Sequence, residues 1–152
     1  MKIRYLAAAA VVVLLGACAT VPPARDDRKV AELIDRVNAG PVDWALEQSH
    51  VPFFFDAELL VRSADVELMW QGLRESSLIV QPEGFSLEPA RSGDYARIAE
   101  TFDMQTFFSP EGSFPEEATW LLADSNLGQL LILLGDRSAR LPVIYGIARV
   151  ER

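Results

Sequence analysis

The sequence predicts one small α+β domain, and three observations support that prediction. The chain has 152 residues, half of them apolar, which is enough for one hydrophobic core. Apolar residues recur at helical spacing over residues 30–37, near the beginning of the chain. The last third instead contains apolar runs over 118–123, 128–134 and 143–150, separated by turn residues. Helices that precede strands in this way are typical of the α+β class.

The first predicted helix is amphipathic, with apolar residues at positions i, i+3, i+4 and i+7. Asp26 or Asp27 is expected to cap its beginning, because a short acidic side chain accepts hydrogen bonds from the first N–H groups. Residues 38–41 read NAGP and are expected to end it, since glycine suits a left-handed cap and proline cannot continue a helix. A short second helix is expected over about 42–48, with Trp44 buried.

A β-hairpin is expected next, after residues 49–52, which contain a proline and are expected to interrupt regular structure. The segment VPFFFDAELLV over 51–61 is rich in residues that favour strands. Residues 53–55 and 59–61 are predicted as strands, and the residues 56–58 between them have turn-forming composition. The segment is therefore expected to form either a tight hairpin or one long bulged strand.

A third helix is predicted after residue 62. Ser63 is expected to cap it, and Asp65 lies in its first turn, where a carboxylate interacts favourably with the helix dipole. One face of this helix is apolar and is formed by Val66, Met69, Trp70 and Leu73.

The middle of the chain contains shorter predicted elements. Strands are expected over 78–81 and 85–87, on either side of a Pro-Glu-Gly turn. Residues 92–102 show helical spacing of apolar side chains, and a strand is expected over 104–108.

The three C-terminal apolar runs are expected to form an antiparallel meander, because short turn-forming segments connect them. Residues 130–134 are all leucine or isoleucine and show no polar alternation. Such a strand is expected at the centre of a sheet, covered on both faces.

The N-terminus has the layout of a secretory signal. Lys2 and Arg4 form a positive region. Residues 6–15 then supply an apolar stretch that is too short to span a hydrocarbon core of ~30 Å as a helix. The segment is therefore expected to direct export and not to cross the membrane.

The only cysteine follows this stretch in the run Leu15-Gly16-Ala17-Cys18, which resembles the lipobox of bacterial lipoproteins. The resemblance implies that the chain is cut before the cysteine and that lipid on Cys18 anchors it to a membrane of the bacterial cell envelope. Ala19 stands where lipoproteins retained in the inner membrane of enterobacteria typically have aspartate. This favours the outer membrane, with the domain facing the periplasm.

The expected organisation is a signal peptide over 1–17, a lipidated cysteine with a flexible tether over 18–29, and one domain over 30–152. Of the 14 basic residues, cleavage removes Lys2 and Arg4, which leaves 12 against 22 acidic residues and a formal charge of −10. A domain this acidic repels phosphate backbones, so nucleic acid is not an expected partner.

The order of predicted elements is similar to that of the NTF2-like superfamily, which includes the SnoaL-like proteins. The sequence NAGPVDWAL over 38–46 resembles their N-x-G-D-x-x-A-L pattern, residues 50–56 resemble their first strand, and residues 63–70 resemble their capped third helix. The resemblance covers roughly residues 28–75. It implies paired helices, a hairpin and a third helix packed on a curved antiparallel sheet, a cystatin-like cone. Members of the superfamily include dehydratases, isomerases and domains that only bind, so the fold does not fix the function.

Few residues suit catalysis or metal binding. His50 is the only histidine, and the sequence has no G-x-S-x-G elbow and no glycine-rich phosphate loop, so no metal and no cofactor are expected. The acid–base chemistry of the superfamily's enzymes remains as an alternative, with His50, Asp56, Asp65 and Tyr95 as candidates. Roles in turns, helix beginnings and packing also account for these four residues.

The favoured interpretation is a non-catalytic binding domain. Phe54, Trp70 and Trp120 are expected either to fill the core or to line a cavity for a small apolar ligand. The loop over 109–115 is expected to expose Phe114 as an anchor for an envelope protein. Dimerisation through the sheet, which is common in the superfamily, is a further alternative.

Overall fold

The computed structural model describes residues 24–135 and 140–150. The predicted signal peptide, Cys18 and the first part of the predicted tether lie outside the described residues. Within the described part of the chain, none of the helices has the length and apolar composition needed to cross a membrane.

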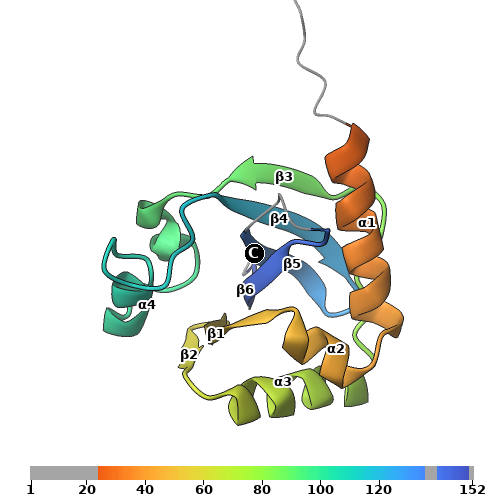
Figure 1. Ribbon diagram of the computed structural model, residues 1–152, viewed down its shortest axis with the longest axis horizontal. Helices are drawn as coiled ribbons and strands as arrows, with labels where there is room; N and C mark the ends of the chain where they lie inside the picture. The colour runs from red at the N-terminus through yellow and green to blue at the C-terminus, as the bar shows by residue number, and fades with distance from the viewer. Residues whose placement is uncertain (1–23, 136–139, 151–152) are drawn as a thin grey trace, which may run out of the picture.

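The described residues form helices and a six-stranded sheet, which confirms the predicted α+β class (Figure 1). The elements are α1 (Ala24–Ala39), α2 (Val42–Glu47), β1 (Ser49–Phe55), β2 (Glu58–Leu60), α3 (Ser63–Glu75), β3 (Ser86–Pro89), the 3-10 helix η1 (Ser92–Arg97), α4 (Phe102–Phe107), β4 (Ala118–Ser125), β5 (Gly128–Gly135) and β6 (Val143–Arg149).

The sheet is mixed, with the strand order β2-β1-β6-β5-β4-β3. Strands β3 to β6 pair antiparallel, whereas β1 pairs with β6 in parallel, with Phe54 opposite Gly146 and Phe55 opposite Ile147. The expectation of a wholly antiparallel sheet is therefore wrong. Strands joined by a tight turn have to be antiparallel, but most of the chain lies between β1 and β6, so tertiary packing sets their relative direction.

Local turn chemistry accounts for the hairpin. β1 and β2 pair antiparallel and are joined by Asp56 and Ala57. Asp56 has a φ angle of 49°, in the left-handed region that aspartate tolerates better than most residues. Of the two expected forms, the structure shows the hairpin and not the single bulged strand.

β5 has a neighbour on each side and alternates its side chains between the two faces of the sheet. Leu130, Ile132 and Leu134 enter one hydrophobic core, and Leu131 and Leu133 enter another. All five are buried, which confirms the prediction of a central strand covered on both faces.

The larger core, called here the three-helix core, lies between one face of the sheet and helices α1 to α3. The predicted apolar face of α1 is buried in it, and Trp70 of α3 donates its indole N–H to Ser49 Oγ over 2.9 Å. Its buried members are Val30, Leu33, Ile34, Val37, Ala45, Phe53, Val66, Trp70, Leu78, Val80, Leu121, Ala123, Leu130, Ile132, Leu134, Ile144 and Ile147.

The opposite face of the sheet carries the aromatic core. Residues of η1 and α4 pack on it, and α4 lies at the other side of the view from α1 (Figure 1). The buried Trp120 ring is held by a hydrogen bond of 2.8 Å from its indole N–H to Asp94 Oδ2 of η1. The buried members are Phe54, Met104, Phe107, Phe108, Ala118, Trp120, Leu131, Leu133 and Ala148.

The N-terminal part of the domain differs from the prediction. α1 spans Ala24–Ala39 and so includes residues 24–29, which are expected to belong to the tether, and Asp26 and Asp27 lie within the helix instead of capping it. Acidic residues are compatible with the first turn of a helix, so they do not mark its first residue. Trp44 is half-buried where full burial is expected, and the Arg36 guanidinium lies 5.8 Å from its ring centroid.

Two further boundaries are corrected around the hairpin. Residues 49–52 belong to β1 and do not interrupt it. Pro52 lies in a stretch where the register between β1 and β6 shifts, so its missing N–H is tolerated there. Ser63 is the first residue of α3 and not its cap, and Arg62 occupies the N-cap position.

The middle of the chain departs furthest from the prediction. The helix expected over 92–102 is a 3-10 helix that ends at Arg97, and α4 occupies the place of the strand expected over 104–108. Alternation along a strand would send Phe107 and Phe108 to opposite faces of the sheet, whereas Phe107 at the end of α4 and Phe108 at its C-cap both reach the aromatic core. Of the two short strands expected here, 78–81 forms only one isolated bridge at Val80.

Candidate functional site

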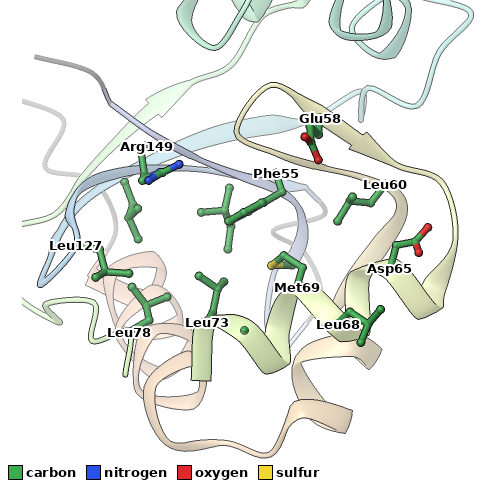
Figure 2. Close-up of a pocket in the computed structure, with 13 residues that line it drawn as sticks. Phe55, Glu58, Leu60, Asp65, Leu68, Met69, Leu73, Leu78, Leu127 and Arg149 are labelled. Atoms are coloured by element: carbon green, nitrogen blue, oxygen red, sulfur yellow. The ribbon is translucent and has the colours of Figure 1, made fainter. Parts of the chain in front are cut away.

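A groove of about 550 Å³ opens between α3 and the β1–β2 hairpin, on the side of the three-helix core (Figure 2). Its volume lies in the range of small-molecule sites in proteins, and most of its lining is apolar. The lining residues are Phe55, Glu58, Leu60, Asp65, Leu68, Met69, Gly72, Leu73, Leu78, Leu127, Leu130, Ile147 and Arg149.

Helix α3 forms one wall of the groove. Met69 and Leu73 extend from it toward the sheet, and Leu68 lies beside them (Figure 2). Gly72 belongs to the same wall, and no atom would lie within 4 Å of a Cβ added there. The missing side chain at Gly72 therefore contributes directly to the open volume.

The sheet and its turns form the opposite wall. Phe55 and Leu60 come from the hairpin and Ile147 from β6. Two leucines of the groove are well exposed to solvent, with exposed fractions of 64% for Leu68 and 44% for Leu127. Exposed apolar residues that gather around one groove indicate a binding surface more often than exposed apolar residues scattered singly.

Three charged residues, Glu58, Asp65 and Arg149, lie among the lining of the groove (Figure 2). Arg62 Nη2 lies 2.6 Å from Asp65 Oδ1, and this hydrogen bonding lowers the pKa of the Asp65 carboxyl below its usual value. The side chain of Arg149 is 65% exposed and also belongs to an ion pair, with its Nη2 2.5 Å from Oδ2 of Asp56.

A second cavity of about 600 Å³, called here the polar cavity, adjoins the groove. The two share Leu127 and Arg149, and the lining of the polar cavity includes a second arginine, Arg97. Its lining residues are Asp56, Ala57, Ala96, Arg97, Ile98, Leu127, Ala148, Arg149 and Val150.

The four candidates for acid–base chemistry do not meet in one cavity. Asp65 lines the groove and Asp56 lines the polar cavity, while His50 and Tyr95 line neither. Tyr95 packs against the aromatic core. His50 is half-buried and its ring stacks on Tyr145, with centroids 4.4 Å apart.

Asp56 has a structural role in the turn between β1 and β2. Its Oδ1 accepts the backbone N–H of Arg149 at 2.8 Å, and its Oδ2 accepts Nε and Nη2 of the same residue. The backbone N–H of Asp56 donates to the carbonyl of Ile147 at 2.8 Å. These bonds fasten the hairpin to the end of β6.

The aromatic residues singled out by sequence lie in the cores and not around a cavity. Phe54 and Trp120 are fully buried in the aromatic core, and Trp70 is 1% exposed in the three-helix core. The expectation that Phe114 is an exposed anchor is wrong. It is half-buried and packs on Phe108, with ring centroids 5.1 Å apart. Contact with the aromatic core removes part of this apolar ring from water, which is favourable.

Sequence reasoning missed the groove, although two signals for it are present. Gly72 stands in the middle of a helix, where glycine costs about 1 kcal/mol relative to alanine. Leu68 is apolar but lies outside the predicted buried face of the same helix. An unpacked glycine beside an unburied leucine indicates a helix surface that does not pack against the rest of the chain.

The described ranges, 24–135 and 140–150, contain no group of three or more histidine, cysteine or acidic residues placed to hold a metal ion. Comparison with known proteins finds no matching family model, no matching curated protein and no matching solved structure.

Proposed function

We propose that this chain is a lipid-anchored lipoprotein of the bacterial cell envelope whose periplasm-facing domain binds a small apolar ligand in the groove. The groove itself is the observation that carries the binding part of the proposal. It combines a volume suited to a small molecule, an apolar lining and a few charged residues that can orient a ligand.

We favour binding over acid–base catalysis because the candidate residues are separated. A general base and a group that stabilises the developing charge have to reach one substrate at the same time. His50, Asp56 and Tyr95 line no common cavity, and Asp56 is held by Arg149. A small ligand is also favoured over an envelope protein, since Phe114, the proposed anchor for such a partner, packs inward. Dimerisation through the sheet stays a prediction.

We also propose the NTF2-like superfamily as the finer fold assignment. The support for it is the order of elements, in which two helices, a hairpin and a third helix precede the remaining strands. This is the order that the resemblance over residues 28–75 implies. Domains that only bind occur in that superfamily, which is compatible with the proposed function.

The anchor rests on the N-terminal sequence alone and is tested by itself. Replacing Cys18 with alanine removes the acceptor of the lipid. The native protein is expected to partition into detergent and to carry acyl chains detectable by intact mass, and the Cys18→Ala chain to carry none. A Cys18→Ala protein that still carried lipid would refute the anchor and leave the groove untouched.

The groove is tested with residues 24–152, which lack the cysteine and contain all the residues that the structure describes as buried in the two cores. The probe is phenylnaphthylamine, a neutral dye whose fluorescence rises in apolar surroundings. Gly72→Leu places a side chain in the groove and keeps a good helix former in α3. Loss of the contacts that this side chain displaces is expected to lower the dye affinity about tenfold or more.

Gly93→Leu is the matched control. Gly93 is exposed in η1, lines neither the groove nor the polar cavity, and has no atom within 4 Å of an added Cβ. Thermal unfolding of both variants checks that each is folded. Equal dye binding by the two variants, or no dye binding by the unchanged domain, would show that the groove is not a ligand site.

A further inference from the structure

Glu58 carries the one charge in the lining of the groove that has no side-chain partner among the residues that the structure describes. The other two charged residues of the lining are held in ion pairs. Asp65 pairs with Arg62 at 2.6 Å, and Arg149 pairs with Asp56 at 2.5 Å. Each pair adds no formal charge, so the carboxylate of Glu58 leaves the groove with one negative charge.

The register of the hairpin directs this carboxylate toward the groove. Glu58 lies opposite Phe55 on the neighbouring strand, and Leu60 lies opposite Phe53. Cross-strand partners, and residues two positions apart on one strand, lie on the same face of a sheet. Phe53 is buried in the three-helix core, so this is the face on which the groove opens. Figure 2 shows Glu58 at the hairpin side of the groove, near Phe55 and Leu60.

The side chains around Glu58 suit a cation that carries an apolar chain. Glu58 is exposed and therefore accessible, and its cross-strand partner Phe55 contributes an aromatic ring to the same lining. The face of an aromatic ring attracts a cation, and a carboxylate beside the ring adds a direct charge contact. Leu60 and Met69 continue the lining with apolar surface. The groove can therefore contact a positive group and an alkyl chain of the same molecule.

The charge of the whole domain acts in the same direction. Residues 24–152 contain all 22 acidic residues of the chain but, without Lys2 and Arg4, only 12 of its 14 basic residues, so their formal charge is −10. A charge of this sign raises the concentration of cations near the surface and lowers that of anions. It does not select a site by itself, whereas the carboxylate of Glu58 beside an apolar groove does.

We infer that the ligand of the groove is an amphiphilic cation, whose ammonium group contacts Glu58 and Phe55 and whose alkyl chain lies against α3. This inference rests on the proposed binding function and adds the charge of the ligand to it. A primary and a quaternary ammonium group share the required charge. The primary group also donates hydrogen bonds to the carboxylate, whereas the quaternary group depends on the charge and the aromatic ring alone.

The first experiment compares head groups on the same ten-carbon chain (a length chosen for solubility). Displacement of phenylnaphthylamine from residues 24–152 is measured with decylammonium, decyltrimethylammonium, decanol and decanoate. The cations are expected to bind about three- to tenfold more tightly than decanol, and decanoate less tightly than decanol. The advantage of the cations is expected to shrink at high salt, because screening weakens an exposed charge pair. The tighter of the two cations identifies the ammonium group as primary or quaternary.

The second experiment separates Glu58 from the overall charge of the domain. Glu58→Gln removes one negative charge and keeps the size of the side chain. It is expected to lower the affinity for decyltrimethylammonium about two- to fivefold and to leave the affinity for decanol unchanged. Glu83→Gln is the matched control, because Glu83 is exposed and lines neither the groove nor the polar cavity, and its replacement changes the net charge equally. Thermal unfolding checks that both variants are folded.

The third experiment tests the aromatic contact. Phe55→Leu removes the ring and keeps an apolar side chain in the groove. The affinity for decyltrimethylammonium, divided by that for decanol, is expected to fall about two- to fivefold, because leucine offers no ring face to a cation. The ratio is the readout because a looser hairpin would weaken both ligands together. An unchanged ratio would overturn the placement of the ammonium group at this ring.

The outcomes separate this inference from the function on which it rests. If decanol or decanoate bound as tightly as the two cations, the cationic ligand would be overturned and the apolar groove would stand as the site. Equal losses of cation affinity in Glu58→Gln and Glu83→Gln would assign the preference to the net charge and overturn the contact with Glu58. Failure of every ten-carbon compound and of the dye to bind would overturn the proposed function itself.

Discussion

The two faces of the sheet bury apolar side chains in different ways. In the aromatic core, the Phe54 ring lies 5.6 Å from Phe107, 6.1 Å from Phe108 and 6.2 Å from Trp120, measured between centroids. On the other face, helices α1 to α3 cover the sheet with mostly aliphatic residues, and the groove opens where α3 and the hairpin separate.

The two sides of the sheet also differ in the free space around a glycine. A Cβ added to Gly146 would lie 2.2 Å from the Phe54 ring, whereas one added to Gly72 would meet no atom within 4 Å. The aromatic core is filled, and the surface of α3 is not. The side of α3 therefore retains open space, and this is where we propose that a ligand binds.

The largest effect is expected from removing a ring from the filled side. Phe54→Ala deletes a fully buried ring at the centre of the aromatic core and is expected to lower the free energy of unfolding by about 3–5 kcal/mol. Urea unfolding of residues 24–152 measures the change. A loss below about 1 kcal/mol would mean that the aromatic core repacks easily and that the two faces differ less than the ring contacts indicate.

The aromatic core is also expected to lose stability when a single methyl group is added to it. Gly146→Ala forces the Phe54 ring or strand β6 to move and is expected to cost about 1–3 kcal/mol of unfolding free energy. Thermal and urea unfolding report this cost. A neutral Gly146→Ala substitution would contradict the tight approach of β6 to the ring.

The matched change on the open side is expected to have the opposite sign. Gly72→Ala meets no neighbour and reduces the conformational freedom of the unfolded chain, so it is expected to raise the unfolding free energy by about 0.5–1 kcal/mol. The same unfolding assay applies. Destabilisation by this substitution would show that the wall of the groove is packed more tightly than its geometry indicates.

The smallest effect concerns the ion pair beside the groove. Arg62 lowers the pKa of Asp65, so the folded state binds a proton there less readily than the unfolded state does. The pair therefore stabilises the fold above the ordinary pKa of aspartate, and this contribution disappears as the pH falls through the lowered value. An NMR titration of the Asp65 carboxyl should show a lowered midpoint that returns to the ordinary value in Arg62→Gln.

Most of the fold was predictable because its elements depend on neighbours in the sequence. The periodicity over 30–37 places the buried face of α1, and the turn composition after Phe55 places the hairpin. The region 92–108 was not predictable in the same way. The spacing of its apolar residues does not distinguish helix from strand, and burial of both Phe107 and Phe108 in one core decides between the two.

The candidate site was less predictable than the fold. The sequence identifies His50, Asp56 and Tyr95 as candidates because of their side-chain chemistry. It does not show that these residues lie apart in the fold. Asp56 and Arg149 are separated by most of the chain and meet only because β1 and β6 pair in parallel. The Phe54–Trp120 contact depends on the same tertiary arrangement.

By itself, the sequence determined the α+β class, the place of α1 to α3, the hairpin and the doubly covered β5, because periodicity and turn chemistry are local properties. It also contains the run around Cys18 that resembles a lipobox, from which we propose the anchor. Only the tertiary structure decided the parallel pairing of β1 with β6, the filled aromatic core and the groove beside Gly72. These features depend on which distant surfaces meet and on how well they fill space, which no single segment encodes.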